Sequence, residues 1–172
     1  VGCYGVLLDP PGYPYPWGKT PDGRMKPDLI APSGTESAGA RSDDAMRNHT
    51  ATSGATPYAA GAALLLRNWL TRPWQTEPFD PDPGQVYALL MLSGDKVGPF
   101  TAATQTGVGR FRLPVSGLTL CGKVWVSEAT RAVDIPVQLP GDGADAVSAA
   151  LWWPETAVVV GGVPKDEHND VD

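Results

Sequence analysis

The sequence predicts an α/β fold up to about residue 116, followed by an antiparallel β-module over residues 117–172. Two Ala- and Leu-rich runs, GATPYAAGAALLLRNWLT and GQVYALLMLSG, stand in the first part among short β-forming segments and long loops. After residue 116 the runs become rich in β-branched and aromatic residues, with turn signals such as PGDGAD between them. Since the first composition favours helices and the second favours strands, the chain divides into two units.

The bulk composition is that of a globular protein and disfavours several functions. Of the 172 residues, 42% are hydrophobic and 19% are charged, which suffices for a sizeable core. The net charge of -6 repels phosphate backbones, so we expect no nucleic-acid partner. No apolar run approaches the roughly 18 residues of a membrane span, so we expect none. The chain begins in an apparent strand and stops at NDVD, which indicates a fragment or a processed chain.

The N-terminal part alternates short strands with loops. Residues 1–8 carry β-formers and predict a strand. The prolines and glycines of residues 9–24 predict a long loop, because proline cannot donate to a ladder. Leu29 and Ile30, bounded by prolines, predict a very short strand, and the polar residues 33–50 predict another loop.

The first helix is expected to begin near Gly54. Thr52 or Ser53 is a suitable N-cap, and Pro57 suits a first turn, where its missing N–H is not needed. From Ala59 to Leu66 the run is apolar on nearly every side. We therefore expect this helix to be buried.

A second helix and four strand-like runs follow. Asp82 and Pro83 form a favourable N-cap and N1 pair for a helix that ends near Gly94. The strand-like runs are LTLCGKVWVS, AVDIPVQL, AVSAALWWP and TAVVVGGV.

The two cysteines have no metal-binding spacing. Cys3 and Cys121 are far apart in sequence and form no CxxC pair. Two buried free thiols are the favoured interpretation, and a disulfide between them is the alternative, since the distance between their Cα atoms decides.

The stretch HTATSGATPYAAGAALLL, residues 49–66, gathers hydroxyls ahead of an apolar helix. A serine at a helix N-terminus lies beside unpaired N–H groups that can stabilise an oxyanion. Small neighbours leave room for a scissile carbonyl. An ordinary N-cap explains the same residue types, so the cluster alone leaves both interpretations open.

A general base for such a serine is not evident. His49 stands four residues before Ser53 and could act as one, but nothing local dictates the geometry, and an exposed loop histidine is the simpler interpretation. His168 lies in the polar tail KDEHNDVD, where we expect a solvated side chain.

Two segments carry a family resemblance. KPDLIAPSG resembles the K-P-D-[IVL]-x-A-P-G segment, and TATSGATPYAAGAALLL resembles the G-T-S-M-A-[ST]-P-H-V-A-G-A-A-A-L-L motif, of subtilisin-like serine proteases, the subtilases. VGCYG and GVGRFRLP resemble the strands that come before and after these segments in the family, so order and spacing agree across residues 1–116. Within residues 51–61, the positions that match the serine motif are Thr52, Ser53, Ala55, Thr56, Pro57, Ala60 and Gly61.

Within residues 51–61, four positions depart from the serine motif. Ala51 stands where the family usually has Gly, and Gly54 stands where it usually has Met. Tyr58 replaces the usual His and Ala59 the usual Val. Because the loop before the serine lies close to bound substrate in the family, Ala51 is expected to narrow the cleft without abolishing chemistry.

The resemblance implies a fold and a nucleophile. It implies a subtilisin-like, parallel-sheet, three-layer fragment in which Ser53 is the nucleophile and its own N–H contributes to the oxyanion hole. The triad runs Asp, His, Ser in chain order, so the Asp, the His and the oxyanion-hole Asn belong to an upstream segment. Neither His49 nor His168 stands at the family's position.

Residues 117–172 resemble the β-sandwich module that follows the catalytic domain in many subtilases, here truncated. The acidic residues of its last stretch are expected to form a solvated face, with a structural calcium site as the alternative. No cofactor is required for the chemistry. These acidic residues are Asp166, Glu167, Asp170 and Asp172.

The resemblance therefore implies a serine endopeptidase acting on protein or peptide substrates, in a secreted or extracytoplasmic location. Its partner would be the upstream half of the protease, and we expect the isolated chain to be inactive and ordered only with that half. The alternative is a non-catalytic interaction or structural module derived from a subtilase.

Overall fold

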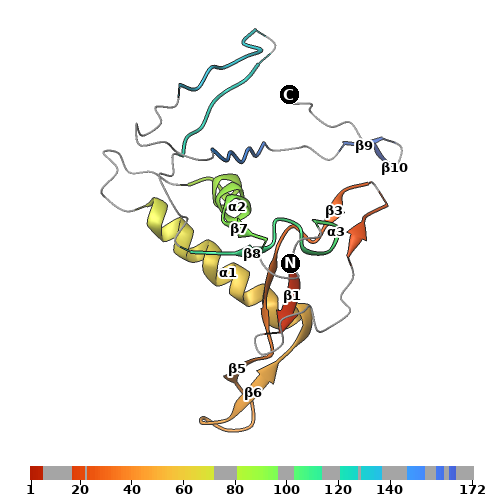
Figure 1. Ribbon diagram of the computed structural model, residues 1–172, viewed down its shortest axis with the longest axis vertical. Helices are drawn as coiled ribbons and strands as arrows, with labels where there is room; N and C mark the ends of the chain where they lie inside the picture. Colours follow the sequence, from red (N-terminus) through yellow and green to blue (C-terminus); the bar gives the residue numbers. More distant parts are fainter. Residues whose placement is uncertain are drawn as a thin grey trace.

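The computed structural model contains a small mixed sheet, two main helices and three short hairpins (Figure 1). It describes residues 1–5, 17–21, 23–71, 81–96, 103–113, 121–127, 129–136, 147–153, 158–160 and 163–165. The helices are α1 (Ala51–Leu70), α2 (Pro83–Leu92) and α3 (Ala103–Thr106). The strands are β1 (Gly2–Gly5), β2 (Gly18–Lys19), β3 (Met25–Lys26), β4 (Ile30–Ser33), β5 (Thr35–Ala38), β6 (Met46–His49), β7 (Gly94–Asp95), β8 (Arg110–Phe111), β9 (Val158–Val160) and β10 (Val163–Lys165).

The main sheet has the strand order β1-β4-β8-β7. β1 pairs in parallel with β4, from Gly2 opposite Ile30 to Gly5 opposite Ser33. β4 pairs in parallel with β8, whereas β7 pairs antiparallel with β8. The predicted α/β class with a parallel-containing sheet is therefore confirmed, and the three-layer arrangement stays a prediction.

The core joins the sheet to α1 and α2. A small cluster beneath the sheet consists of Cys3, Ile30, Ala31 and Ala55. A larger cluster lies between the two helices and the residue before β4, and it comprises Leu29, Ala59, Ala62, Leu66, Leu70, Val86, Leu89 and Leu90. α1 thus contacts β1, β4 and α2 along a single side.

The loop predicted for residues 33–50 is wrong. β5 and β6 pair antiparallel, from Thr35 opposite His49 to Ala38 opposite Met46, and extend away from the sheet (Figure 1). The strand side chains are exposed apart from a half-buried Thr35, so no alternation of apolar residues marked them in the sequence. The loop predicted for residues 9–24 is also wrong in part, because β2 pairs with β3; residues 6–16 lie outside the described ones.

The helix α1 begins three residues earlier than predicted. Its N-cap is Thr50, not Thr52 or Ser53, and Pro57 lies inside the helix rather than in its first turn. A proline at that position lacks the N–H that would bond to the carbonyl of Ser53. The Ser53 carbonyl therefore accepts no hydrogen bond from the backbone of residue 57.

The expectation that α1 is buried all round is also wrong. Leu64 is 69% exposed, Leu65 is 65% exposed and Tyr58 is 42% exposed. The sheet and α2 cover one side of the helix, and none of the described segments covers the other. This apolar face is the largest departure from the predicted burial.

The predictions for α2 are confirmed. Asp82 is the N-cap, its carboxylate accepts from the Gly84 N–H at 3.1 Å, and Gln85 completes a capping box. Pro83 occupies the first helical position, and the helix ends at Leu92. Every element of this helix start was readable from local sequence because caps are short-range interactions.

The predicted β-sandwich is not shown. The described parts of its first three strand-like runs, residues 121–127, 132–136 and 147–153, contain no strand. In the last run β9 is a strand, and it pairs antiparallel with β10, which begins at the final residue of that run. His168 and the acidic residues 166, 167, 170 and 172 lie outside the described residues.

Both cysteines are free thiols, as predicted, but only one is buried. Cys3 is 2% exposed in β1, whereas Cys121 is exposed. The prediction of two buried thiols is wrong for Cys121 because the described segment that carries it makes no core. In the part of the chain that the structure describes, no helix is long and apolar enough to cross a membrane.

Candidate active site

The start of α1 is held against the end of β4. After Ser33 the chain turns at Gly34, which has a φ of 81°, and enters the β5–β6 hairpin. The Gly34 N–H donates to the carbonyl of His49 at 2.9 Å, so the hairpin closes on itself at its base. The hairpin therefore returns the chain beside β4 just where the helix begins.

Ala51 adopts a left-handed backbone conformation at the first position of α1. Its φ is 59°, the one positive φ among the described non-glycine residues. This conformation costs an alanine about 1–2 kcal/mol. Since the family usually has glycine here, the departure noted in the sequence falls on a position where glycine would be unstrained.

Gly54 leaves no room for a side chain. A Cβ on Gly54 would lie 2.7 Å from the carbonyl oxygen of His49. The Gly54 N–H donates to the carbonyl of Thr50 at 3.2 Å. The absence of the family's usual Met is thus explained by the backbone of residues 49 and 50, which packs against this position.

Ser53 is exposed and is the third residue of α1. In a helix that begins at Ala51, the N–H groups of residues 51–53 have no intrahelical acceptor. The side chain of Thr50 makes no capping hydrogen bond, and the first turn holds no acidic residue. The serine hydroxyl therefore lies beside backbone donors whose helix dipole favours a developing negative charge.

The other hydroxyls of the cluster have different roles. The Thr56 hydroxyl donates to the carbonyl of Thr52 at 2.8 Å, so it serves the helix itself. Thr50 is the N-cap residue, with an extended backbone. Among the clustered hydroxyls, Ser53 is the one whose placement suits a nucleophile.

No base stands beside Ser53 in the described chain. His49 is exposed at the end of β6, and no hydrogen bond among the described residues joins its side chain to Ser53. The described residues contain no group of three or more His, Cys, Asp or Glu side chains able to hold a metal ion. Among the described residues, no hydrogen bond therefore links Ser53 to a side chain that could accept its proton.

A second cluster, which sequence reasoning left unassigned, surrounds the KPD segment. Lys26 Nζ contacts both carboxylate oxygens of Asp28, at 2.7 and 2.8 Å. The hydroxyl of Tyr87 in α2 donates to Asp28, and burial, with the Asp28 charge and this hydrogen bond, raises the pKa of Tyr87 to about 12. The Asp28 carbonyl accepts from the Val108 N–H at 2.9 Å. The KPD segment therefore ties α2 and the turn before β8 to the start of β4.

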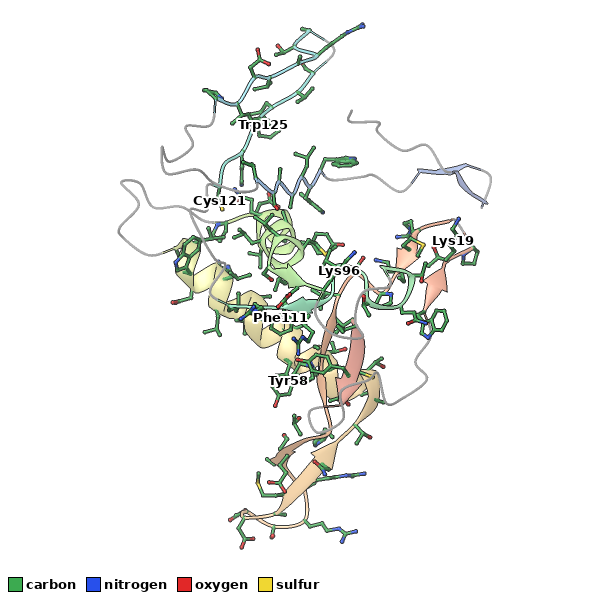
Figure 2. The ribbon with its side chains drawn as sticks, in the orientation of Figure 1. Lys19, Tyr58, Lys96, Phe111, Cys121 and Trp125 are labelled. Atoms are coloured by element: carbon green, nitrogen blue, oxygen red, sulfur yellow. The ribbon has the colours of Figure 1, made fainter. Side chains whose placement is uncertain are left out.

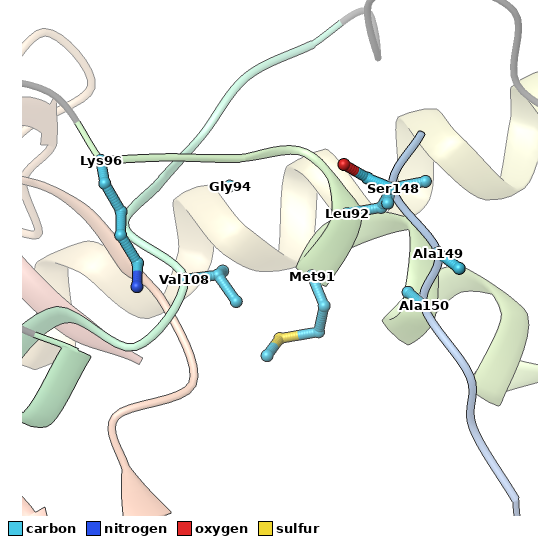
Figure 3. A pocket seen from close by; sticks show the side chains of 8 residues that line it. All are labelled: Met91, Leu92, Gly94, Lys96, Val108, Ser148, Ala149 and Ala150. Atoms are coloured by element: carbon cyan, nitrogen blue, oxygen red, sulfur yellow. The ribbon is translucent and has the colours of Figure 1, made fainter. Parts of the chain in front are cut away.

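Two pockets formed by described residues lie away from Ser53. One lies between the end of α2, β7 and a short segment after residue 146 (Figure 3), lined by Met91, Leu92, Gly94, Lys96, Val108, Ser148, Ala149 and Ala150. Another lies on the sheet, where Arg110 stacks over the Tyr4 ring at 5.9 Å and Arg112 pairs with Asp95 at 3.0 Å. Neither lining includes a residue of the α1 start, so neither pocket is a cleft for Ser53.

Comparison with known proteins identifies one family. A sequence model of the subtilase family matches residues 15–109, more than half of the chain. The match spans the KPD segment, the α1 start and α2, and it ends before β8. No curated protein and no solved structure matches the chain. The matched residues lie within the predicted first unit, 1–116, and the β-module after it lies outside the match.

Proposed function

The chain belongs to the subtilase family, and from this we propose that it carries the nucleophile of a serine endopeptidase, Ser53. The observation that supports this most is the exposed Ser53 hydroxyl at the uncapped N-terminus of α1. An ordinary N-cap serine would precede the helix and bond to its N–H groups, whereas Ser53 lies inside the first turn.

The proposed reaction is peptide hydrolysis through an acyl-enzyme. Ser53 Oγ attacks the scissile carbonyl carbon while a histidine accepts its proton, and the oxyanion is stabilised by the Ser53 N–H. The histidine then protonates the leaving amine, and water hydrolyses the ester in the same way. An aspartate orients the histidine. We propose that an upstream segment, in the same or a separate chain, supplies both residues and the oxyanion-hole asparagine.

The substrate and location belong to the same proposal. A protein or peptide chain is the substrate class, and the family resemblance favours a secreted or extracytoplasmic site of action. No cofactor takes part in the chemistry, and a structural calcium ion in residues 166–172 remains the alternative to a solvated acidic face.

Labelling with a fluorophosphonate tests the proposal. Full-length protein that includes the upstream segment should be labelled on Ser53, and Ser53→Ala should abolish the label. Ser37→Ala is the matched control, because Ser37 is an exposed serine in the β5–β6 hairpin and should not affect labelling. A folded full-length protein that takes no label would contradict the endopeptidase.

The second candidate is a non-catalytic interaction or structural module. It is favoured by the exposed apolar side of α1, which includes Tyr58, Leu64 and Leu65 and is suited to packing against another chain. A full-length protein without labelling whose α1 face becomes protected from hydrogen exchange on binding a partner would support this function.

A further inference from the structure

We propose that Ser33 is a positioning residue for the nucleophile, whose hydroxyl holds the backbone turn at Ala51 that presents Ser53. The inference rests on the proposed function of Ser53. It assigns a role to a residue of β4 that lies eighteen positions before its partner in the chain.

The contact joins the sheet to the helix start. Ser33 is the last residue of β4 and is 6% exposed. Its Oγ donates to the carbonyl oxygen of Ala51 at 3.0 Å. Because a buried hydroxyl without a partner is unfavourable, this hydrogen bond fixes the end of β4 and the first residue of α1 relative to each other.

The hydrogen bond from Ser33 is made to a residue whose backbone conformation is unfavourable. Ala51 has a φ of 59°, and such a conformation persists in a non-glycine residue only when surrounding interactions over-determine it. Hydrogen bonds to three successive carbonyls provide these interactions. The carbonyl of His49 accepts from the N–H of residue 34, and the carbonyl of Thr50 accepts from the N–H of residue 54. The carbonyl of Ala51 accepts from the hydroxyl of Ser33. Of these three donors, only Ser33 uses a side chain.

The two residues are also departures from the family pattern. The K-P-D-[IVL]-x-A-P-G segment has glycine where this chain has Ser33, and the serine motif has glycine where it has Ala51. These departures touch each other in the structure. Since glycine adopts a positive φ without strain, the hydroxyl should matter only while residue 51 is alanine.

A double-mutant cycle on the full-length protein tests this coupling. The rate constant of fluorophosphonate labelling, taken per folded molecule, is measured for wild type, Ser33→Ala, Ala51→Gly and the double variant. Ser33→Ala loses one buried hydrogen bond that orients the nucleophile, so its labelling rate constant should fall about tenfold. Ala51→Gly and the double variant should label at rates within about twofold of each other.

Two further readouts separate positioning from general stabilisation. Peptide hydrolysis by Ser33→Ala should show a lower kcat with an unchanged KM, because the substrate-binding surface is intact. Hydrogen exchange of the Gly54 amide, which bonds to Thr50, should quicken in Ser33→Ala and return to normal in the double variant.

Several results would overturn the proposal. A Ser33→Ala protein that labels as fast as wild type, or a double variant much slower than Ala51→Gly, would remove the positioning role and leave the endopeptidase intact. If Ser33→Ala does not fold, the comparison of Ala51→Gly with the double variant decides alone. Wild-type protein that is folded and unlabelled would overturn the proposed function and this inference together.

Discussion

The described residues up to 113 and those from 121 onward contrast sharply, although both are rich in apolar side chains. In the first region Ile30 and Leu70 have no exposed surface, and the backbone of every main strand is paired. In the second region Trp125 is 89% exposed and lies outside the sheet and helices in Figure 2, and Ile135 is 63% exposed. β-forming residues make a core only when a second layer covers them, so composition alone did not predict burial.

The largest expected effect is on stability, and it comes from replacing a glycine of the first region, with a glycine of the second region as the control. A Cβ on Gly107, whose φ is 58°, would lie 2.0 Å from the carbonyl oxygen of Asp28. Gly107→Ala should lower the free energy of unfolding of the full-length protein by about 3 kcal/mol or more, measured by denaturant titration. The matched control is Gly122→Ala in the second region, where a Cβ meets nothing within 4 Å. Equal losses of unfolding free energy in the two variants would contradict the difference in packing between the regions.

The next effect compares two large apolar side chains. Ile30→Ala should cost about 3 kcal/mol, because it leaves a cavity between the sheet and α1. Trp125→Ala should change the unfolding free energy by about 0.5 kcal/mol or less, since the ring makes little buried surface. Both values come from the same denaturant titrations. A large loss in Trp125→Ala would mean that the second region has a core after all.

A smaller effect appears at alkaline pH. The pKa of Tyr87 is raised from 10.0 to about 12 by burial and by Asp28, so the folded state resists deprotonation. The stability this contributes is complete below pH 10 and is lost as the pH rises to about 12. Tyr87→Phe should flatten this part of the stability profile, and Asp28→Asn should reduce it. An unaltered profile in Tyr87→Phe would show that another group is responsible.

The smallest effect is chemical and leaves stability unchanged. Cys121 is exposed, whereas Cys3 is buried in β1, and burial raises the pKa of both thiols. Iodoacetamide should alkylate Cys121 first, because the reagent can reach the exposed sulfur without local unfolding. Peptide mass spectrometry over time measures the order. Alkylation of Cys3 before Cys121 would contradict the burial of β1.

Features that depend on local interactions could be predicted from the sequence of this protein. The strand at Gly2–Gly5 and the cap of α2 at Asp82 follow from patterns within a few residues, whereas Ser53 was singled out by the resemblance to the family motif. Turn-forming residues and helix caps act through neighbouring backbone groups, so they can be recognised from the sequence. The family match over residues 15–109 supports the motif that singled out Ser53.

Tertiary structure alone decided where α1 begins, which side of it is covered and what holds its first turn. The positive φ of Ala51 and its bond to Ser33 depend on a hairpin that returns the chain to β4, eighteen residues later. The polar strands of that hairpin pair through backbone groups that every sequence shares, so no side-chain pattern predicted them. Contacts between distant residues are set by topology, and for that reason the serine motif could be read from the sequence while the hydrogen bond between Ser33 and Ala51 could not.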